Sequence, residues 1–558
     1  MWLPFFFRSL TYESTIMRHF TRTLLLTLSI LLSTTSIDAR EPSMWRTLHR
    51  LALQQRQGNV VPLAEGHTRL RFGISLTPEK SAGAGTIKIS QITADGSRKP
   101  LKLSGIIERD NFWYSVDESS FVDIPSQEVS IDIVKGIESK LVTLDFDLTN
   151  SRNQELVIPV NLERFSHLAK QKMISGNTHV HIMRKTYRQA TDYLQLVPES
   201  DDLRLVWVSH LRRIPDEREY ITNQFTPSSL HAISTDKVTL GFGEEHRHNF
   251  GIGGEGWGHV MLLDIPELVR PVSIGPGIMR SGSDGRPVQK GILAARGSGG
   301  TVIWCHNDFG LEDIANWTLG FIHAQNIFDG GSVGSYDATF YRYLNVGMQV
   351  PFSTGTDWFI YDYSRAYVPV RGRVTSNKWL AALRKGETFI TNGPVLSFTA
   401  NQKSIGSTIE LASGSNTVQV NATGKGRTDF KGLELVHNGH VVATVDTQST
   451  DGYFVAEMDT TVDLSEPGWL AVRVPVDNNK NIYDRLIFGH TSPIYFQQNG
   501  QSIFDPDVAL DLMAEMQQAR DKAASTGQFD DDAARNSVIG VYDRAIERME
   551  ELIESGGK

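Results

Sequence analysis

Apolar and polar residues alternate with a period of two in two long stretches of the chain. The first runs from His67 to Phe165, and Val129, Ile131 and Ile133 are a clear example within it. The second runs from Val395 to Phe496. Because successive side chains of a strand point to opposite faces, this period predicts strands with one buried face. We therefore expect two small all-β domains of the sandwich type.

The residues between these stretches, from Leu168 to Pro394, follow a different pattern. Short apolar strands end in polar residues, as where Leu203 to Val208 leads to His210, and partly helical segments separate the strands. This alternation predicts an α/β domain. A β/α barrel brings the ends of its strands to one rim, so polar residues at the strand ends are expected to meet there.

The N-terminus looks like an export signal. Leu24 to Leu32 is an apolar run too short to span a bilayer comfortably, and it follows Arg18 and Arg22. Small residues then lead to Ala39, which fits a cleavage point. We therefore expect an exported protein, periplasmic or extracellular, with no stable membrane span after removal of the signal. Met17 is an alternative start, and an uncleaved membrane anchor is the competing interpretation.

The C-terminal tail predicts two helices. Asp505-Pro506 is a helix cap followed by proline at the first helical position, and Gly527 separates two apolar stripes. The expected organisation is a signal peptide over residues 1–39, a β-sandwich-like domain over 40–167, an α/β barrel over 168–394, a second β-sandwich-like domain over 395–498 and a helical tail over 499–558.

Composition narrows the classes of function. The chain has 558 residues, enough for several domains. Its 55 basic and 64 acidic residues give a formal charge of −9, which argues against a nucleic-acid partner because such proteins normally show a basic excess. The single cysteine, Cys305, allows no intramolecular disulfide and no cysteine-based zinc site. We expect it to be a small buried residue that points away from His306.

The most informative motif is Asn177-Thr178-His179-Val180-His181. On a strand, His179 and His181 would point the same way and Val180 the opposite way, with the two imidazoles about 7 Å apart along the strand. Such a pair can share a cation. A lone His-x-His motif is more often part of an ordinary surface strand, so the interpretation depends on further ligands downstream.

Further candidate ligands do follow at strand ends. The full set is His179, His181, His210, Glu245, His259, His306 and Asp357. Imidazole and carboxylate groups suit zinc, manganese or iron. Each residue alone has an ordinary explanation as a surface charge, a core histidine or a turn residue. Their shared position at the ends of successive strands makes a common metal site the better hypothesis.

These residues carry a resemblance to a known family. The stretch from Ser175 to His181 resembles the opening metal motif of the PHP (polymerase and histidinol phosphatase) superfamily and, more narrowly, exported CehA/McbA-type metallohydrolases. The likeness continues in Gly243-Glu244-Glu245, Gly258-His259-Val260 and Thr356-Asp357, and covers roughly residues 160 to 410. It implies a distorted (β/α)₇ barrel that holds two or three divalent ions.

The resemblance also implies roles for the individual residues. A first metal would bind His179, His181 and Asp357, with Glu245 bridging to a second metal. That second metal would bind Glu245 together with His259 and His306. His210 matches the histidine of the family's Thr-Asp-His motif and would belong to a third metal.

Several residues depart from the family pattern. Ser209 stands where the Thr-Asp-His motif has Asp, Asn177 stands where the opening motif often has Asp, and Phe359 stands where a second histidine usually follows the last Asp. A site with two metals is therefore favoured over one with three, and His210 becomes a candidate for proton transfer or leaving-group contact. His246 and His248 would face away from Glu245, and we interpret them as supporting residues or as rivals to His259.

Basic residues cluster near the proposed ligands in the sequence. They are Arg184, Lys185, Arg212, Arg213 and Arg247. If they border the pocket, they favour an anionic small-molecule substrate, and Arg184, Arg212 and Arg247 are the substrate-binding candidates. The alternative, that they are solvated surface charges, has about equal weight.

The sequence thus leads to an exported metal-dependent hydrolase that uses a metal-bound hydroxide on a phosphoester or on a carboxyl or carbamate ester. One alternative is a catalytically degenerate PHP-like barrel that binds a carbohydrate or a protein partner. Another is a structural surface protein with scattered histidines.

Overall fold

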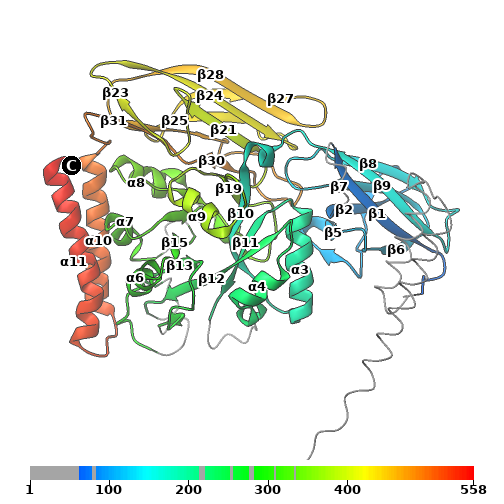
Figure 1. Ribbon diagram of the computed structural model, residues 1–558, viewed down its shortest axis with the longest axis horizontal. Helices are drawn as coiled ribbons and strands as arrows, with labels where there is room; N and C mark the ends of the chain where they lie inside the picture. Colours follow the sequence, from blue (N-terminus) through cyan, green and yellow to red (C-terminus); the bar gives the residue numbers. More distant parts are fainter. Residues whose placement is uncertain are drawn as a thin grey trace, which may run out of the picture. The chain divides into compact units, whose positions relative to one another are not determined.

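Figure 1 shows the chain as a computed structural model. The structure describes residues 62–77, 83–212, 220–251, 256–275, 282–306, 310–331 and 335–557. The expected signal peptide over residues 1–39, with the alternative start Met17, lies outside the described residues. The residues from Leu63 onward form one unit.

Two sheets form the N-terminal β region. One has the order β6 (Val122–Pro125), β1 (His67–Thr77), β9 (Glu155–Glu163), and the other has the order β4 (Ile107–Glu108), β5 (Tyr114–Val116), β2 (Gly85–Ile92), β7 (Glu128–Val134), β8 (Val142–Asp147), with β3 (Arg98–Pro100) beside β2. Phe72 of β1 and Ile131 of β7 lie in the same buried cluster. The alternating pattern thus gives strands whose apolar faces pack sheet on sheet, as its period predicts.

The central element is a curled sheet. From β10 it runs through β11, β12, β13, β15, β16 and β17, and on its other side β10 pairs with β18 and β19. The bounds are β10 (Met173–His181), β11 (Leu205–His210), β12 (Thr239–His248), β13 (Gly258–Leu263), β14 (Ser273–Ile274), β15 (Thr301–Trp304), β16 (Ala324–Asn326), β17 (Phe352–Ser353), β18 (Asp357–Trp358) and β19 (Arg365–Pro369). Most pairings are parallel, but β13 is antiparallel to both β12 and β15, and β19 is antiparallel to β10. The fold is therefore mixed α/β with several β-sheets.

Helices cover the curled sheet (Figure 1). They are α3 (Tyr187–Ser200), α4 (Pro227–Ile233), α6 (Gln289–Gly297), α7 (Asp313–Thr318), α8 (Arg342–Asn345) and α9 (Ser376–Arg384). Thr186 and Gln189 form a capping box that starts α3, directly after the strand end that carries His181. Trp379 of α9 packs so closely on β10 that a Cβ at Gly176 would lie 2.5 Å from its ring. Gly176 is therefore needed for this packing.

The same hydrogen-bonded sheet continues into the C-terminal β region. β19 pairs with β20 (Phe389–Thr391), which pairs with β30 (Gly489–Thr491), so the predicted boundary at Pro394 is not a break in the sheet. The remaining strands of this sheet are β23 (Thr408–Leu411), β25 (Gly432–His437), β26 (His440–Asp446), β29 (Gly468–Arg473) and β31 (Ile494–Gln498). A separate sheet has the order β22 (Lys403–Ser404), β21 (Val395–Ala400), β24 (Asn416–Gly426), β28 (Phe454–Leu464), β27 (Gln448–Ser449).

The tail forms two helices that lie side by side, α10 (Pro506–Thr526) and α11 (Asp532–Ser555) (Figure 1). Leu512 of α10 and Tyr542 of α11 are buried in the same core cluster as Trp304 and Trp379. The apolar stripes predicted from the sequence are therefore packing surfaces. Among the described residues, no helix is long and apolar enough to cross a membrane.

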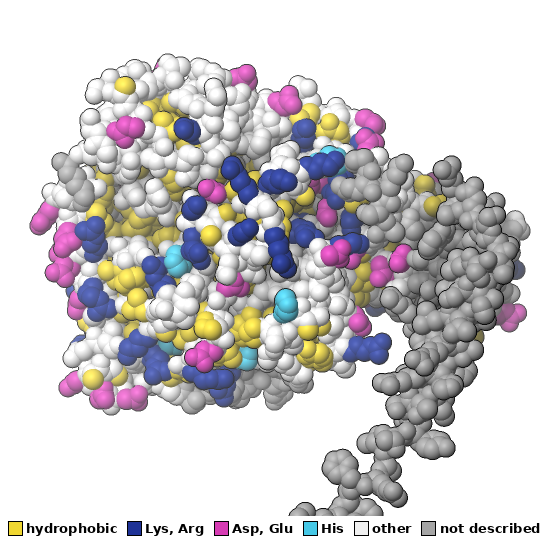
Figure 2. Space-filling view, viewed as in Figure 1, with side chains coloured by type: hydrophobic (Ala, Val, Ile, Leu, Met, Phe, Trp, Pro, Cys, Tyr) yellow, Lys and Arg dark blue, Asp and Glu magenta, His cyan; other side chains and the backbone are white. Residues whose placement is uncertain are grey.

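Figure 2 shows Lys and Arg side chains gathered in the middle of one face, where Figure 1 draws α9. The exposed cations of α9 and its neighbours are Lys170, Lys172, Arg371, Arg373, Lys378, Arg384 and Lys385. They adjoin the start of β10 at Met173, whereas His179 and His181 lie at its end. Along an extended strand, His179 and His181 are about 20 Å and about 26 Å from Met173. Both distances exceed the Debye length of about 8 Å at physiological salt, so the action of these exposed charges on the strand-end histidines is largely screened.

Candidate metal centre

The curled sheet brings six of the seven strand-end candidates together. His179 and His181 end β10, and the parallel pairing of Val180 with Asp357 places Asp357 beside them. Glu245 lies on β12, and its antiparallel neighbour β13 carries His259 on the same face. His306 follows the end of β15. All of these side chains are buried except His306, which is half-buried.

Four of them form the first group of possible metal donors: His179, His181, Glu245 and Asp357. The Nε2 atoms of His179 and His181 are 3.0 Å apart. Glu245 Oε2 lies 3.6 Å and 2.9 Å from these two nitrogens, and Asp357 Oδ1 lies 3.3 Å and 3.6 Å from them. Donors at about 2.05 Å from a tetrahedral ion are about 3.3 Å from one another. The four atoms are therefore spaced like the corners of a metal coordination shell.

The other nitrogen of each histidine fixes the ring. His179 Nδ1 lies 2.6 Å from Asp329 Oδ2, and His181 Nδ1 lies 2.9 Å from the carbonyl oxygen of Ser209. Because both acceptors can only receive a hydrogen bond, Nδ1 is the hydrogen-bond donor in each ring. Nε2 of each ring therefore faces the other members of the first donor group. This is the arrangement by which outer residues orient histidine ligands in metal sites.

Glu245 joins the first group to a second one. While its Oε2 faces His179 and His181, its Oε1 lies 3.4 Å from His259 Nδ1. Glu245, His259 and His306 form the second group of possible donors. The rings of His259 and His306 have centroids 5.6 Å apart. A carboxylate whose two oxygens face two donor groups has the geometry of a bridging ligand.

The ionisation of these groups reflects their mutual charges. Burial opposes a charge on His179, but the carboxylates of Asp329 and Asp357 overcome it and raise its pKa well above the usual value. Burial also opposes a charge on Glu245, but Arg247, His179 and His181 hold its pKa well below the usual value. Burial and the nearby charge of Glu245 raise the pKa of Asp357. Positive charge nearby thus stabilises the buried carboxylates, and protons or a cation can supply it.

Two of the candidate ligands have unusual backbone. His306 and Asp357 have φ values of 57° and 56°, in the left-handed region. For a residue with a side chain this conformation costs about 1 kcal/mol or more, and it is concentrated at functional sites. At both positions the left-handed backbone sets the direction of a candidate ligand side chain.

Cys305 does not point away from the site, which corrects the expectation from the sequence. It lies in a third group with His179, His306 and Asp329. The error arose because β15 ends at Trp304 and the left-handed backbone of His306 breaks the alternation of faces. Burial raises the pKa of the Cys305 thiol to about 12, so the thiol is protonated at neutral pH. The expectation that it is buried holds.

The third group is better explained as support for the first. Its His179 donor is Nδ1, and 2.6 Å to Asp329 is a hydrogen-bond length, shorter than the spacing of two ligands on one ion. Asn326 also donates to Asp329 Oδ2, at 3.0 Å. Asp329 was missed in the sequence. Its position could have revealed it, because Asp329 follows the end of β16 by three residues, and other candidate ligands also lie at or just after strand ends.

His210 is not part of any of the three groups formed by the described residues. It is half-buried at the end of β11. Burial, together with Arg270, His181 and Arg212, lowers its pKa to about 4. The imidazole is therefore neutral at pH 7, near His181 but outside the donor groups.

His246 and His248 face away from Glu245, as the alternation of β12 predicts. His246 Nδ1 lies 2.7 Å from Glu244 Oε1, and His248 Nδ1 donates to the carbonyl oxygen of Arg286. A Cβ at Gly291 would lie 2.0 Å from His246 Nε2, so no space for a ligand remains there. They belong to none of the donor groups among the described residues, and the idea that they compete with His259 is wrong.

The three arginine candidates occupy different places. Arg247 NH1 lies 3.4 Å from Glu245 Oε1, so its charge is directed at a proposed ligand. Arg184 and Arg212 are exposed. Arg212 acts on His210, which places it at the end of β11. The structure thus brings Arg247 alone of the three to the donor groups.

Two of the residues that depart from the pattern of the resembled family, Asn177 and Phe359, have side-chain partners, whereas the buried hydroxyl of Ser209 has no hydrogen-bond partner among the described residues. Asn177 accepts from the backbone N–H of His179 and donates to Thr356, next to Asp357. The ring of Phe359 packs edge-on against Tyr193, with centroids 5.7 Å apart. Asn177 therefore supports the ligand geometry, whereas Phe359 fills its position with an apolar ring.

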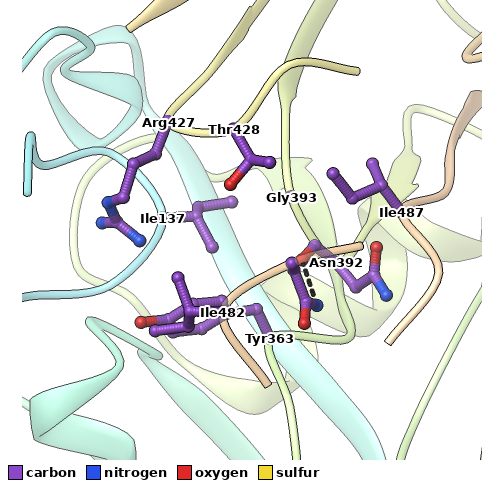
Figure 3. Close-up of a pocket in the computed structure, with 9 residues that line it drawn as sticks. Ile137, Tyr363, Asn392, Gly393, Arg427, Thr428, Ile482 and Ile487 are labelled. Carbon is purple, nitrogen blue, oxygen red and sulfur yellow. Dashed lines mark hydrogen bonds between the residues drawn. The ribbon is translucent and has the colours of Figure 1, made fainter. Parts of the chain in front are cut away.

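A small pocket lies elsewhere (Figure 3). Ile137, Ile482 and Ile487 line a space of about 10 Å³, with Arg427 at its edge. Arg427 already donates to the backbone carbonyl oxygens of Gly136 and Ser139. None of its lining residues belongs to a donor group, so we interpret it as a packing seam.

No protein-family model matches the chain, and no curated protein matches it significantly. What the site can do must therefore be argued from its residues. The buried His, Asp and Glu clusters could hold a metal ion.

Proposed function

We propose that the chain is a metal-dependent hydrolase with a binuclear site. The observation that carries the proposal is the pair of donor groups that share Glu245: His179, His181 and Asp357 on one oxygen, His259 and His306 on the other. Imidazole and carboxylate donors in buried, pre-oriented positions suit zinc, manganese or iron. Two such ions would activate a water molecule and polarise the target oxygen of a phosphoester or of a carboxyl or carbamate ester.

The residues of the chain then have distinct tasks. Asp329 and the Ser209 carbonyl oxygen hold the two histidine rings of β10. Arg247 offsets part of the negative charge of Glu245. His306 is the more exposed donor and marks the side from which a substrate would approach. His210 is our candidate for proton transfer or leaving-group contact, since it is neutral at pH 7 and close to His181.

A PHP-like (β/α)₇ barrel of the CehA/McbA type is the finer fold that we propose for the curled sheet. Parallel strands that present their ends to one centre support it, and the antiparallel strand β13 is the distortion. Export to the periplasm or the cell exterior is likewise a proposal, which rests on the apolar segment from Leu24 to Leu32.

Metal content tests the proposal first. The purified protein is expected to hold about two divalent ions per chain by elemental analysis, and to hydrolyse at least one member of a panel of phosphomonoesters, phosphodiesters and carboxyl or carbamate esters. His179→Ala and Asp357→Ala should lose metal and activity while keeping the circular dichroism spectrum. His231→Ala, at an exposed histidine of α4, is the control and should keep both. If the protein is purified in the presence of divalent metal ions and still binds none, the proposal is refuted.

A catalytically degenerate barrel that binds a carbohydrate or a partner is the second candidate. The apolar ring of Phe359, at a place where the family usually has histidine, favours it. Two bound ions with no hydrolysis across the panel would select this alternative.

A further inference from the structure

An open cleft of about 520 Å³ lies next to Asp357, since Trp358 is among the residues that line it. One wall is the segment 108–112 of the N-terminal β region, which includes the short helix η1 (Asp110–Phe112). The opposite wall is the segment 358–361, directly after Asp357. Lys185 and Tyr193, which follow β10, complete the lining. The cleft is therefore built jointly by the N-terminal β region and the rim of the curled sheet.

Two aromatic residues connect the cleft with the donor groups. The ring of Trp358 lies 5.4 Å from that of His181. A Cβ at Gly331 would lie 3.5 Å from the hydroxyl oxygen of Tyr361. Burial, with Asp329 and Asp357 among the nearby charges, raises the pKa of this hydroxyl. Trp358 and Tyr361 thus belong both to the lining of the cleft and to the surroundings of the donor groups.

Four charged residues line the cleft, Glu108, Arg109, Asp110 and Lys185, and two of them are already paired. Arg109 forms a fully buried ion pair with Asp201, at 2.8 Å. Asp110 lies 2.6 Å from Arg485. Lys185 differs, because among the described residues no carboxylate lies within 4.0 Å of it. Its ammonium group instead lies 5.8 Å from the ring centroid of Phe359 and 5.9 Å from that of Tyr193.

We propose that this cleft holds the non-reacting end of an elongated substrate and that Lys185 binds an anionic group, a carboxylate or a sulfonate, at that end. The inference rests on the proposed hydrolase function, since it identifies the part of the substrate away from the bond that is cleaved. The half-buried rings of Trp358 and Phe359 provide an apolar surface between the donor groups and Lys185. A lysine on a flexible stem can follow an anion of varied shape.

Binding without turnover is the direct test. The probes are biphenyl carboxylate and its neutral isostere biphenyl carboxamide, titrated into the full chain by calorimetry and by tryptophan fluorescence. Wild-type protein should bind the carboxylate about tenfold more tightly than the carboxamide, the size expected for one charge-assisted contact at a half-exposed site. Lys185→Met should abolish this preference and leave carboxamide binding unchanged. Lys403→Met, at an exposed lysine of β22, is the matched control and should keep the preference.

Hydrolysis separates this inference from the proposed function. The substrates are acetate and phosphate esters of hydroxybiphenyl carboxylate and of hydroxybiphenyl carboxamide. Lys185→Met should raise KM for the carboxylate esters about tenfold with little change in kcat. If wild type binds both probes equally well, or if Lys185→Met keeps the preference, the role of Lys185 is refuted. The hydrolase stands if any of the esters is cleaved. If the probes bind as expected and none of the esters nor the wider panel is cleaved, the hydrolase is refuted and the anion-binding cleft stands.

Discussion

Asp329 provides the sharpest test of the site, because it contacts a proposed ligand without being one. Its carboxylate is fully buried and lies 2.6 Å from His179 Nδ1 and 3.0 Å from Asn326 Nδ2. Asp329→Asn keeps the size of the side chain and removes its charge. The amide oxygen can still accept one hydrogen bond. The substitution therefore removes the negative charge beside the ring of His179 but leaves the packing around the ring unchanged.

The size of the effect follows from the contact that is lost. A buried hydrogen bond to a charged group contributes about 1.5–3 kcal/mol, and replacement by a neutral acceptor removes about half or more of that. With 1.4 kcal/mol per tenfold change, the affinity for the first ion should fall by about threefold to a hundredfold. The second ion, on Glu245, His259 and His306, should be affected less.

A competition titration with a chelator of known zinc affinity measures both sites at constant pH. Asp284→Asn is the control, because Asp284 is also fully buried and accepts backbone hydrogen bonds from Gly251 and Gln528, away from the donor groups. That variant should lose stability and keep its metal affinity. Wild-type zinc affinity in Asp329→Asn would show that Asp329 does not position His179, and the assignment of the third group as support would be wrong.

Two further predictions concern stability. Arg109→Met should lower the free energy of unfolding by about 3–5 kcal/mol in a guanidinium titration, because it leaves Asp201 charged and buried without its partner. The double variant with Asp201→Leu should recover much of this loss. An Arg109→Met variant as stable as wild type would contradict the prediction. Burial, with a contribution from Arg473, lowers the pKa of His490 to about 3, while Tyr341 donates to its Nε2. The unfolded chain therefore binds a proton below pH 6.5 that the folded chain does not, and stability falls as the pH drops from 6.5 towards 3. Between pH 7.5 and 5.5 this loss is about 1.4 kcal/mol, so the stability difference between wild type and His490→Gln should shrink by that amount; a constant difference would contradict it.

The cleft shows how the N-terminal β region comes to lie close to the donor groups. In the sequence that region carries no chemistry, and nothing in the alternation of β5 and β7 suggests a role at the site. The ion pair between Arg109 and Asp201 fixes the segment 108–112 against α3. A sequence-remote loop thereby becomes one wall of the cleft beside Trp358.

Local periodicity made the strands and tail helices predictable. Period two specified β7 and β24, and the stripe around Leu512 and Tyr542 specified the packing faces of α10 and α11. Likewise, the spacing of His179 and His181 was enough to place both imidazoles on one face, since the geometry of a single strand determines it.

What the sequence by itself determined is therefore which side chains share a strand face and which strands end in metal-binding residue types. Only the tertiary structure decided that Glu245 directs its two oxygens at different partners, that Asp329 and Cys305 join the site and that His210 stays outside it. These outcomes depend on how strands remote in sequence pair, and on left-handed backbone at His306 and Asp357 that breaks the local alternation. Periodicity describes one element at a time, whereas a site is made by the contacts between elements.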